Sequence, residues 1–233
     1  MEKKANICAY IVYYTLILSL LVVSSYGISS AATVMAQVTP VEGRSCIIVD
    51  AGHGGVDGGA TSCTGILESS LNLQISLRLN DLLHLLGYDT KMIRTTDVSV
   101  YTEGQTIGAK KISDLKNRVK TVNDTQNAML ISIHQNYFED NRYSGAQVFY
   151  NKSGDSLAKL LQKELVSTVN SGSNRQAKSA KGVYLMENVN CAAVLIECGF
   201  LSNPEEEARL RDADYQKALC CVIAGAVSRY LNT

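Results

Sequence analysis

The chain has 233 residues, with 22 lysines and arginines against 22 aspartates and glutamates, so its formal net charge is zero. A nucleic-acid-binding surface usually needs an excess of basic residues, and this chain has none. The absence of tryptophan, with only three phenylalanines, also argues against a surface that stacks on bases. We therefore expect no nucleic-acid partner. Once a distinctive N-terminal segment is set aside, about 190 residues remain, enough for one domain with a sizeable core.

The first 43 residues differ in kind from the rest. Two lysines near the start are followed by no charged residue until Glu42, and residues 7–28 are largely apolar. This pattern is typical of a cleaved signal peptide or a single membrane anchor, followed by a linker. Either would leave the positive end inside and export the domain at residues 44–233, so membrane contact is expected only through residues 1–43.

Short apolar runs rich in β-branched residues, bounded by turn residues, predict six strands. They cover residues 46–50, 90–94, 128–133, 145–150, 183–186 and 193–197. The first strand leads into a loop at residues 53–65 that contains five glycines. A ligand can approach glycine backbone closely.

Apolar residues at helical spacing predict helices at residues 68–86, 114–125 and 155–169. Asn203-Pro204 followed by two glutamates marks the start of two further helical pieces that run to the C-terminus. Residues 97–112 are predicted to be a polar loop. Strands that alternate with helices of a dozen residues predict an α/β fold, with a mostly parallel central sheet of about six strands and helices on both faces.

Seven cysteines, an odd number, include no Cys-x-x-Cys motif, which argues against a structural zinc knuckle. We expect those with apolar neighbours to be small buried hydrophobic side chains. These are Cys46, Cys191, Cys198, Cys220 and Cys221. Export permits disulfides without requiring them.

Two histidines stand directly after β-branched strands. His53 follows the first predicted strand, among glycines, and His134 follows the third. The carboxyl ends of parallel strands form the rim where sites are built, so both can meet Glu68, which opens the first long helix. Two histidines and a glutamate form a known catalytic zinc set that leaves one coordination position for water. There is an alternative for each residue type. Each histidine could simply be hydrogen-bonded within its own loop, and Glu68 could be there because the helix dipole favours an acid at a helix start. His84, inside the first helix, is expected to be structural.

Glu197 ends the apolar run at residues 193–196. A carboxylate does not bury as well as the residues before it, so it is expected at the rim, either paired or beside a metal. A carboxylate beside a zinc-activated water is what a hydrolase needs as a general base. The alternative is a strand-end glutamate that caps the following loop.

Four motifs occur along the chain in the order Asp50-Ala51-Gly52-His53-Gly54-Gly55, Glu68, Ser132-Ile133-His134 and Glu197-Cys198-Gly199-Phe200-Leu201-Ser202-Asn203. Together with Leu115, Arg118 and Gly145-Ala146, they resemble the zinc-dependent N-acetylmuramoyl-L-alanine amidases of type 3, over residues 46–231. The resemblance implies one Zn²⁺ on His53, Glu68 and His134, with Glu197 catalytic. It implies as substrate the amide that joins the lactyl group of N-acetylmuramic acid to L-alanine in peptidoglycan.

Two residues depart from the family pattern. Gln135 stands where alanine commonly follows the second histidine, and Cys198 follows the glutamate where other small residues are common. Within a strand, Cys198 would point away from Glu197, so we do not expect it to be a ligand.

The predicted layout, one exported catalytic domain without a wall-binding domain or a blocking helix, resembles the sporulation and germination members of this family. It implies processing of spore cortex at the forespore wall, where removal of the peptide prepares muramic acid for lactam formation. An exported helper protein or the membrane anchor would then localise the enzyme. Two rival hypotheses are a zinc peptidase that cuts within the stem peptide and a non-catalytic wall-binding module that keeps the fold.

Overall fold

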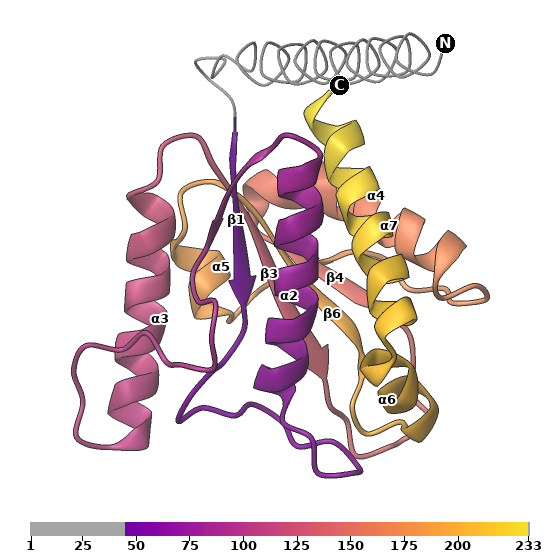
Figure 1. Cartoon of the computed structure of the whole chain (residues 1–233), viewed down its shortest axis with the longest axis horizontal. Coiled ribbons are helices and arrows are strands. Elements are labelled where there is room, and N and C mark those ends of the chain that lie inside the picture. The colour runs from indigo at the N-terminus through magenta and orange to yellow at the C-terminus, as the bar shows by residue number, and fades with distance from the viewer. Residues whose placement is uncertain (1–44, 233) are drawn as a thin grey trace, which may run out of the picture. The chain divides into compact units, whose positions relative to one another are not determined.

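Six strands form one sheet within residues 45–232, the part of the chain that the computed structural model describes (Figure 1). The strand order is β2-β1-β3-β6-β4-β5. The first four are parallel, whereas β4 is antiparallel to β6 and parallel to β5, so the predicted mostly parallel sheet is confirmed. The strands are β1 (Cys46–Ala51), β2 (Asp89–Met92), β3 (Ala128–Asn136), β4 (Gln147–Tyr150), β5 (Lys178–Ser179) and β6 (Ala192–Phe200). The predicted signal peptide or anchor at residues 1–43 lies outside the described residues.

Helices cover both faces of the sheet, as predicted. The helices are α2 (Glu68–Leu85), α3 (Ile107–Asn123), α4 (Asp155–Thr168), α5 (Tyr184–Asn188), α6 (Pro204–Arg211) and α7 (Ala213–Leu231), with a short 3₁₀ turn, η1, at Lys152–Gly154. Alternate residues of β1 point to opposite faces. Ile47 and Val49 belong to the core that includes residues of α2, α4 and α7, and Ile48 belongs to the core that includes residues of α3 and α5. Within residues 45–232, no helix combines the length and apolar character needed to cross a bilayer.

Helix α2 connects the rim of the sheet to its opposite end. Leu71, Ile75, Leu79 and Leu83 recur at helical spacing and are fully or almost fully buried. The helix ends because Gly87 takes a left-handed conformation, with φ of 83°, which lets the Tyr88 amide donate to the Leu83 carbonyl. The first residue of α2 is therefore fixed at the rim by a helix that is packed along its whole length.

Two predicted elements were wrong. Helix α3 begins at Ile107 and not at residue 114, because Thr106 caps it and accepts a hydrogen bond from the Ala109 amide. Its first turns are exposed, so no apolar pattern marked them. The run at residues 183–186, predicted to be a strand, contains the N-cap and first three residues of helix α5. Leu185 and Met186 are buried side by side there, which does not distinguish a short helix from a strand in sequence.

The cysteines match the prediction in part. Cys46, Cys198 and Cys220 are buried, as expected, whereas Cys191 is half-buried and Cys221 is exposed. The six cysteines within residues 45–232 are all free thiols.

Candidate metal centre at the sheet rim

The fold brings the four predicted site residues to one end of the sheet. His53 follows the carboxyl end of β1 by two residues, and His134 lies near the carboxyl end of the adjacent strand β3. Glu197 on β6 stands directly opposite His134 in the parallel register. Glu68 is the first residue of α2, whose N-terminus lies at this same end (Figure 1).

Three of these side chains form a close cluster. The Nε2 atom of His53 lies 3.2 Å from one oxygen of Glu68, and Nδ1 of His134 lies 2.9 Å from the other. One ligand atom from each residue lies within 4.8 Å of the others, and this is the only such group of histidine, cysteine and acidic residues in the described part of the chain. Imidazole nitrogens and a carboxylate oxygen are donors that Zn²⁺ accepts, so the set fits a zinc ion.

Glu68 is buried yet ionised. Its carboxylate accepts hydrogen bonds from the backbone amides of Ala60 at 3.0 Å and Gln135 at 3.2 Å. Burial alone would raise its pKa, but the hydrogen bonds and charges of His134 and His53 outweigh burial and hold the pKa of Glu68 well below its usual range. The residue is thus an anion at neutral pH, which is the form that binds a cation.

His53 is held in an unusual backbone conformation, with φ of 59°. Its Nδ1 donates to a carboxylate oxygen of Asp57 at 2.9 Å, and its Nε2 faces a carboxylate oxygen of Glu68 at 3.2 Å. Burial lowers the pKa of His53, but hydrogen bonds to Glu68 and Asp57 more than offset it, so the pKa lies above its usual value. A carboxylate on the second nitrogen is the common support of a metal-binding histidine. The sequence analysis did not identify Asp57. The only available sign was that an acidic residue lies four positions after His53 in the same loop.

Glu197 differs from Glu68 in its surroundings. Its Oε2 atom is buried and has no hydrogen-bond partner within residues 45–232. Burial raises the pKa of Glu197 to about 7. A carboxylate with a pKa near neutrality can both take and return a proton at physiological pH. The group is therefore suited to acid–base chemistry beside the cluster.

A sequence profile of N-acetylmuramoyl-L-alanine amidases matches residues 47–229, which include all four site residues. The chain belongs to the type 3 N-acetylmuramoyl-L-alanine amidase family. It is a peptidoglycan amidase. It is 34% identical, over 236 aligned residues, to the germination-specific N-acetylmuramoyl-L-alanine amidase of Bacillus subtilis (strain 168), an alignment that covers 100% of this chain and 97% of that protein.

Solved structures agree with the fold of this amidase. The CwlD amidase from Clostridioides difficile, solved in complex with the GerS lipoprotein, is 38% identical and superposes with a TM-score of 0.78 over 81% of this chain and 99% of that one. An N-acetylmuramoyl-L-alanine amidase from Clostridium difficile 630 is 29% identical, with a TM-score of 0.72 over 82% of this chain and 99% of that one.

A layer of buried amides lies beneath the cluster of this amidase. The Asn72 side chain is fully buried, and its Nδ2 donates both to Glu68, at 3.2 Å, and to the Gly52 carbonyl, at 3.1 Å. Gln135 in turn donates to Oδ1 of Asn72 at 3.2 Å, which orients the Asn72 amide. Gln135, which departs from the family pattern, therefore helps to hold Glu68 in place through Asn72. In the sequence, Asn72 is marked only as a polar residue four positions after Glu68.

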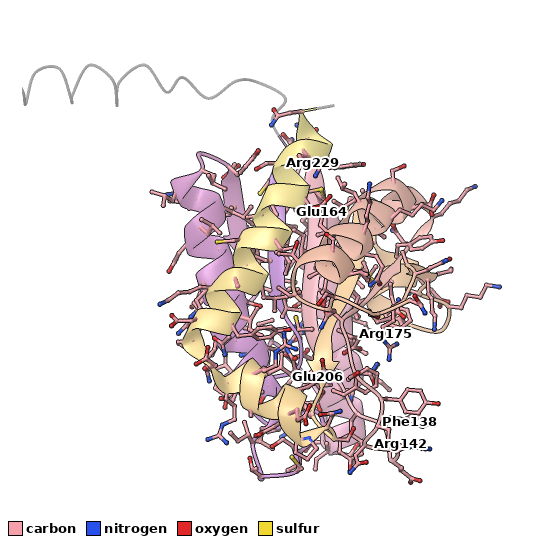
Figure 2. All side chains as sticks on the ribbon, turned by 90° about the vertical axis from the view of Figure 1, so that its right-hand side faces the viewer. Phe138, Arg142, Glu164, Arg175, Glu206 and Arg229 are labelled. Carbon is pink, nitrogen blue, oxygen red and sulfur yellow. The ribbon has the colours of Figure 1, made fainter. Side chains whose placement is uncertain are left out.

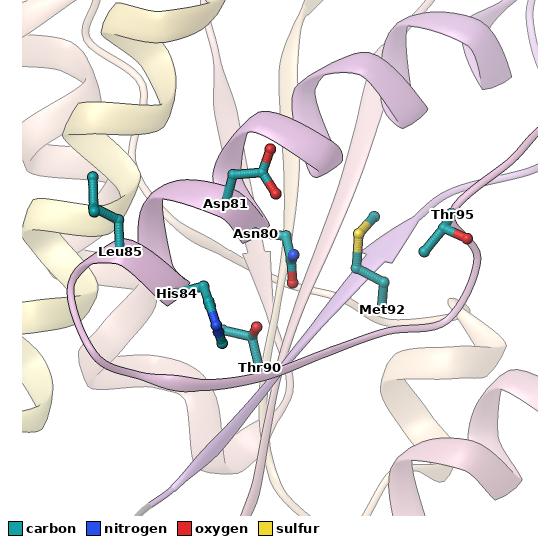
Figure 3. A pocket seen from close by; sticks show the side chains of 7 residues that line it. All are labelled: Asn80, Asp81, His84, Leu85, Thr90, Met92 and Thr95. Atoms are coloured by element: carbon teal, nitrogen blue, oxygen red, sulfur yellow. The ribbon is translucent and has the colours of Figure 1, made fainter. Parts of the chain in front are cut away.

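The third histidine of the amidase lies elsewhere. His84 is exposed near the end of α2, in a surface pocket of about 550 Å³ beside β2 (Figure 3). The pocket lining includes Asn80, Asp81 and Met92, and His84 is outside the metal-type cluster. His84 therefore lies away from the cluster at the rim, and its expected structural role stays a prediction.

Aromatic and basic side chains are exposed just beyond β3 in the amidase. Tyr137, Phe138 and Tyr143 are about half-exposed, and the Phe138 and Tyr143 rings meet edge to face at 4.8 Å. Figure 2 shows Phe138 and Arg142 at one end of the molecule, with Glu164 and Arg229 at the other. Exposed apolar patches often mark binding surfaces, and this one begins three residues after His134.

Gly52→Ala is expected to destabilise the amidase by about 1–3 kcal/mol through overpacking. A Cβ atom at residue 52 would lie 2.2 Å from Nε2 of His134, so the imidazole ring must move away from its place beside Glu68. Urea denaturation measures the loss. Gly225→Ala is the matched control, because that helical glycine has open space around its Cβ position and alanine should stabilise it by about 0.5–1 kcal/mol. Equal effects of the two substitutions would contradict the tight packing of residue 52.

Proposed function

We propose that this amidase hydrolyses the amide between the lactyl group of N-acetylmuramic acid and L-alanine, with one Zn²⁺ held by His53, Glu68 and His134 and with Glu197 as general base. The observation that carries the proposal is the His-Glu-His cluster within 4.8 Å, with Glu197 opposite His134 in the adjacent strand. The family match supports the choice of amide over a bond within the stem peptide. Retention of all four residues argues against a non-catalytic module.

When bound, Zn²⁺ supplies Lewis acidity, which lowers the pKa of water to about 7 and polarises a carbonyl oxygen. The chain supplies the proton transfers. Glu197 takes a proton from the attacking water and passes it to the alanine nitrogen as that group leaves. Its raised pKa, near 7, suits both steps. Asp57 keeps the His53 ring oriented, and Asn72 and the Gln135 amide keep Glu68 in place.

We place this activity in spore cortex processing, where removal of the peptide precedes lactam formation on muramic acid. The similarity to a germination-specific amidase over the whole chain supports this role. We also propose an exported helper protein as partner, supported by the solved relative, which is in complex with the GerS lipoprotein. Export would proceed through residues 1–43, with the domain at residues 44–233 acting at the wall, either secreted or membrane-anchored.

Digestion of purified peptidoglycan tests the proposal. The protein is expected to release new N-terminal alanine, and a chelator should abolish the release until Zn²⁺ is restored. Mass spectrometry of the products separates the alternatives, because a stem-peptide peptidase would expose a different N-terminus. Elemental analysis of the purified protein should give about one zinc per chain. Chelator-resistant cleavage, or an N-terminus other than alanine, would contradict the proposed function.

A further inference from the structure

Buried arginines converge on the backbone of the segment that carries His53. Arg94 donates from Nε to the Ala51 carbonyl at 2.8 Å and from Nη2 to the Gly52 carbonyl at 3.0 Å. Arg118 donates from Nη1 to the Ala51 carbonyl at 3.0 Å and from Nη2 to the His53 carbonyl at 2.7 Å. Three consecutive carbonyls are thus bound by two guanidinium groups.

This segment needs an external support. His53 is a non-glycine residue with φ of 59°, a left-handed conformation that is unfavourable for an L-residue. Such a conformation persists only where surrounding contacts over-determine it. The carbonyl bonds from Arg94 and Arg118 are contacts of this kind, and they act on the backbone without touching the imidazole ring.

Arg94 also connects the two elements that carry the proposed ligands. Its side chain is buried, at 3% exposure, and its four hydrogen bonds all go to backbone carbonyls. One of these carbonyls, at 2.8 Å, belongs to Ser69, the residue after Glu68 in the first turn of α2. One guanidinium therefore spans the loop of His53 and the helix start of Glu68. Burying a cation on neutral acceptors is costly, which makes a purely incidental placement a poor explanation.

Arg118 is held in place by two carboxylates. Its guanidinium pairs with the buried carboxylate of Asp50 and with Asp114 on its own helix, and Asp50 also accepts a hydrogen bond from Ser132 at 2.7 Å. These partners hold the fork in one orientation, so that its remaining N–H groups point to the Ala51 and His53 carbonyls. Lysine, with a single ammonium group, cannot reproduce such a planar fork.

We propose that Arg94 and Arg118 are positioning residues that fix the spacing of His53 and Glu68 before any metal binds. The inference rests on the proposed function for the identity of the metal. It differs from that function because it assigns a role to two buried residues that are neither proposed ligands nor the proposed base.

Arg94→Lys and Arg118→Lys in the full-length protein test this role. Each is expected to weaken zinc binding about 10–100-fold, the usual cost of losing an outer partner of a metal ligand. Competition with a chelating dye measures the affinity. The visible spectrum of the Co²⁺-substituted protein should change as well, and kcat should fall while KM stays constant. The control is Asn151→Ala. Asn151 directly follows β4, at the end of the sheet opposite to the rim, and the substitution removes three side chain–backbone hydrogen bonds there. It should lower the melting temperature and leave zinc affinity unchanged.

Hydrogen exchange of the metal-free wild-type protein gives a second test that does not depend on variants folding. The Gly52 amide, bonded to the Ile133 carbonyl, and the Gly54 amide, bonded to Asp57, should exchange slowly without zinc. Rapid exchange of these amides in the metal-free protein would overturn the inference. Arginine variants that lose stability as Asn151→Ala does, yet keep wild-type zinc affinity and Co²⁺ spectrum, would overturn it too. A wild-type protein that binds no zinc would refute the proposed function, while hydrogen exchange would still decide the role of the arginines.

Discussion

Glu197→Gln is expected to lower kcat by about 10²–10⁴-fold, the usual contribution of a general acid–base group, while zinc stays bound. Glutamine has the same shape but cannot accept and return a proton. The Oε2 atom of Glu197 has no hydrogen-bond partner among the described residues, so an amide in its place breaks no contact of that atom. The substitution also removes a carboxyl group whose pKa burial has raised to about 7. The folded state should therefore be at least as stable as the wild type.

Release of N-terminal alanine from peptidoglycan measures the rate, and elemental analysis measures the zinc. Glu164→Gln is the matched control, because Glu164 pairs with Arg229 at the far end of the molecule and should leave kcat unchanged (Figure 2). If the Glu197 variant cleaved at the wild-type rate, another residue would be the base. If it lost zinc, Glu197 would be a ligand and the assignment of roles would have to change.

The central sheet could be predicted because its strands carry a strong signal. The runs at β1, β3 and β6 are apolar and β-branched, as expected for strands buried on both faces. Helix α2 repeats leucine and isoleucine at helical spacing and ends at a glycine that takes positive φ. The start of α3 was missed because its exposed residues, among them Ile107 at 70% exposure, carry no amphipathic pattern. Helix α5 was missed because five residues are too few for a period to show.

The convergence of the four site residues could also be predicted, because parallel strands deliver their carboxyl ends to one rim. The supporting roles of the residues around them could not be predicted. Arg94 bonds to Ala51 from 43 positions further along the chain and Arg118 bonds to His53 from 65, and neither has a local pattern that reveals a buried guanidinium. Asn72 bridges Glu68 and Gly52 only once α2 has packed against β1. The glycines were expected to let a ligand approach the backbone. At Gly52 and Gly59 the groups that approach closely are side chains of the protein itself, His134 and Glu68.

His53→Ala is expected to lose zinc, from about one ion per chain to almost none, and with it all measurable turnover, because two ligands remain where three are needed. His53→Gly should lose both equally. The two variants should differ in stability, since residue 53 has φ of 59°, which alanine adopts at a cost and glycine adopts freely. We expect metal-free His53→Gly to be more stable than His53→Ala by about 1 kcal/mol, the reverse of the usual order of these residues.

Elemental analysis and urea denaturation of the two metal-free variants measure these effects together. Both variants lose the same hydrogen bonds to Asp57 and Glu68, so their difference isolates the backbone. A variant that retained one zinc per chain would show that His53 is not a ligand. Alanine more stable than glycine at residue 53 would show that the left-handed conformation is not imposed by the chain around it. The expected pair of results, equal loss of zinc and unequal stability, would show that the fold holds His53 in an unfavourable conformation because the metal centre requires its ring there.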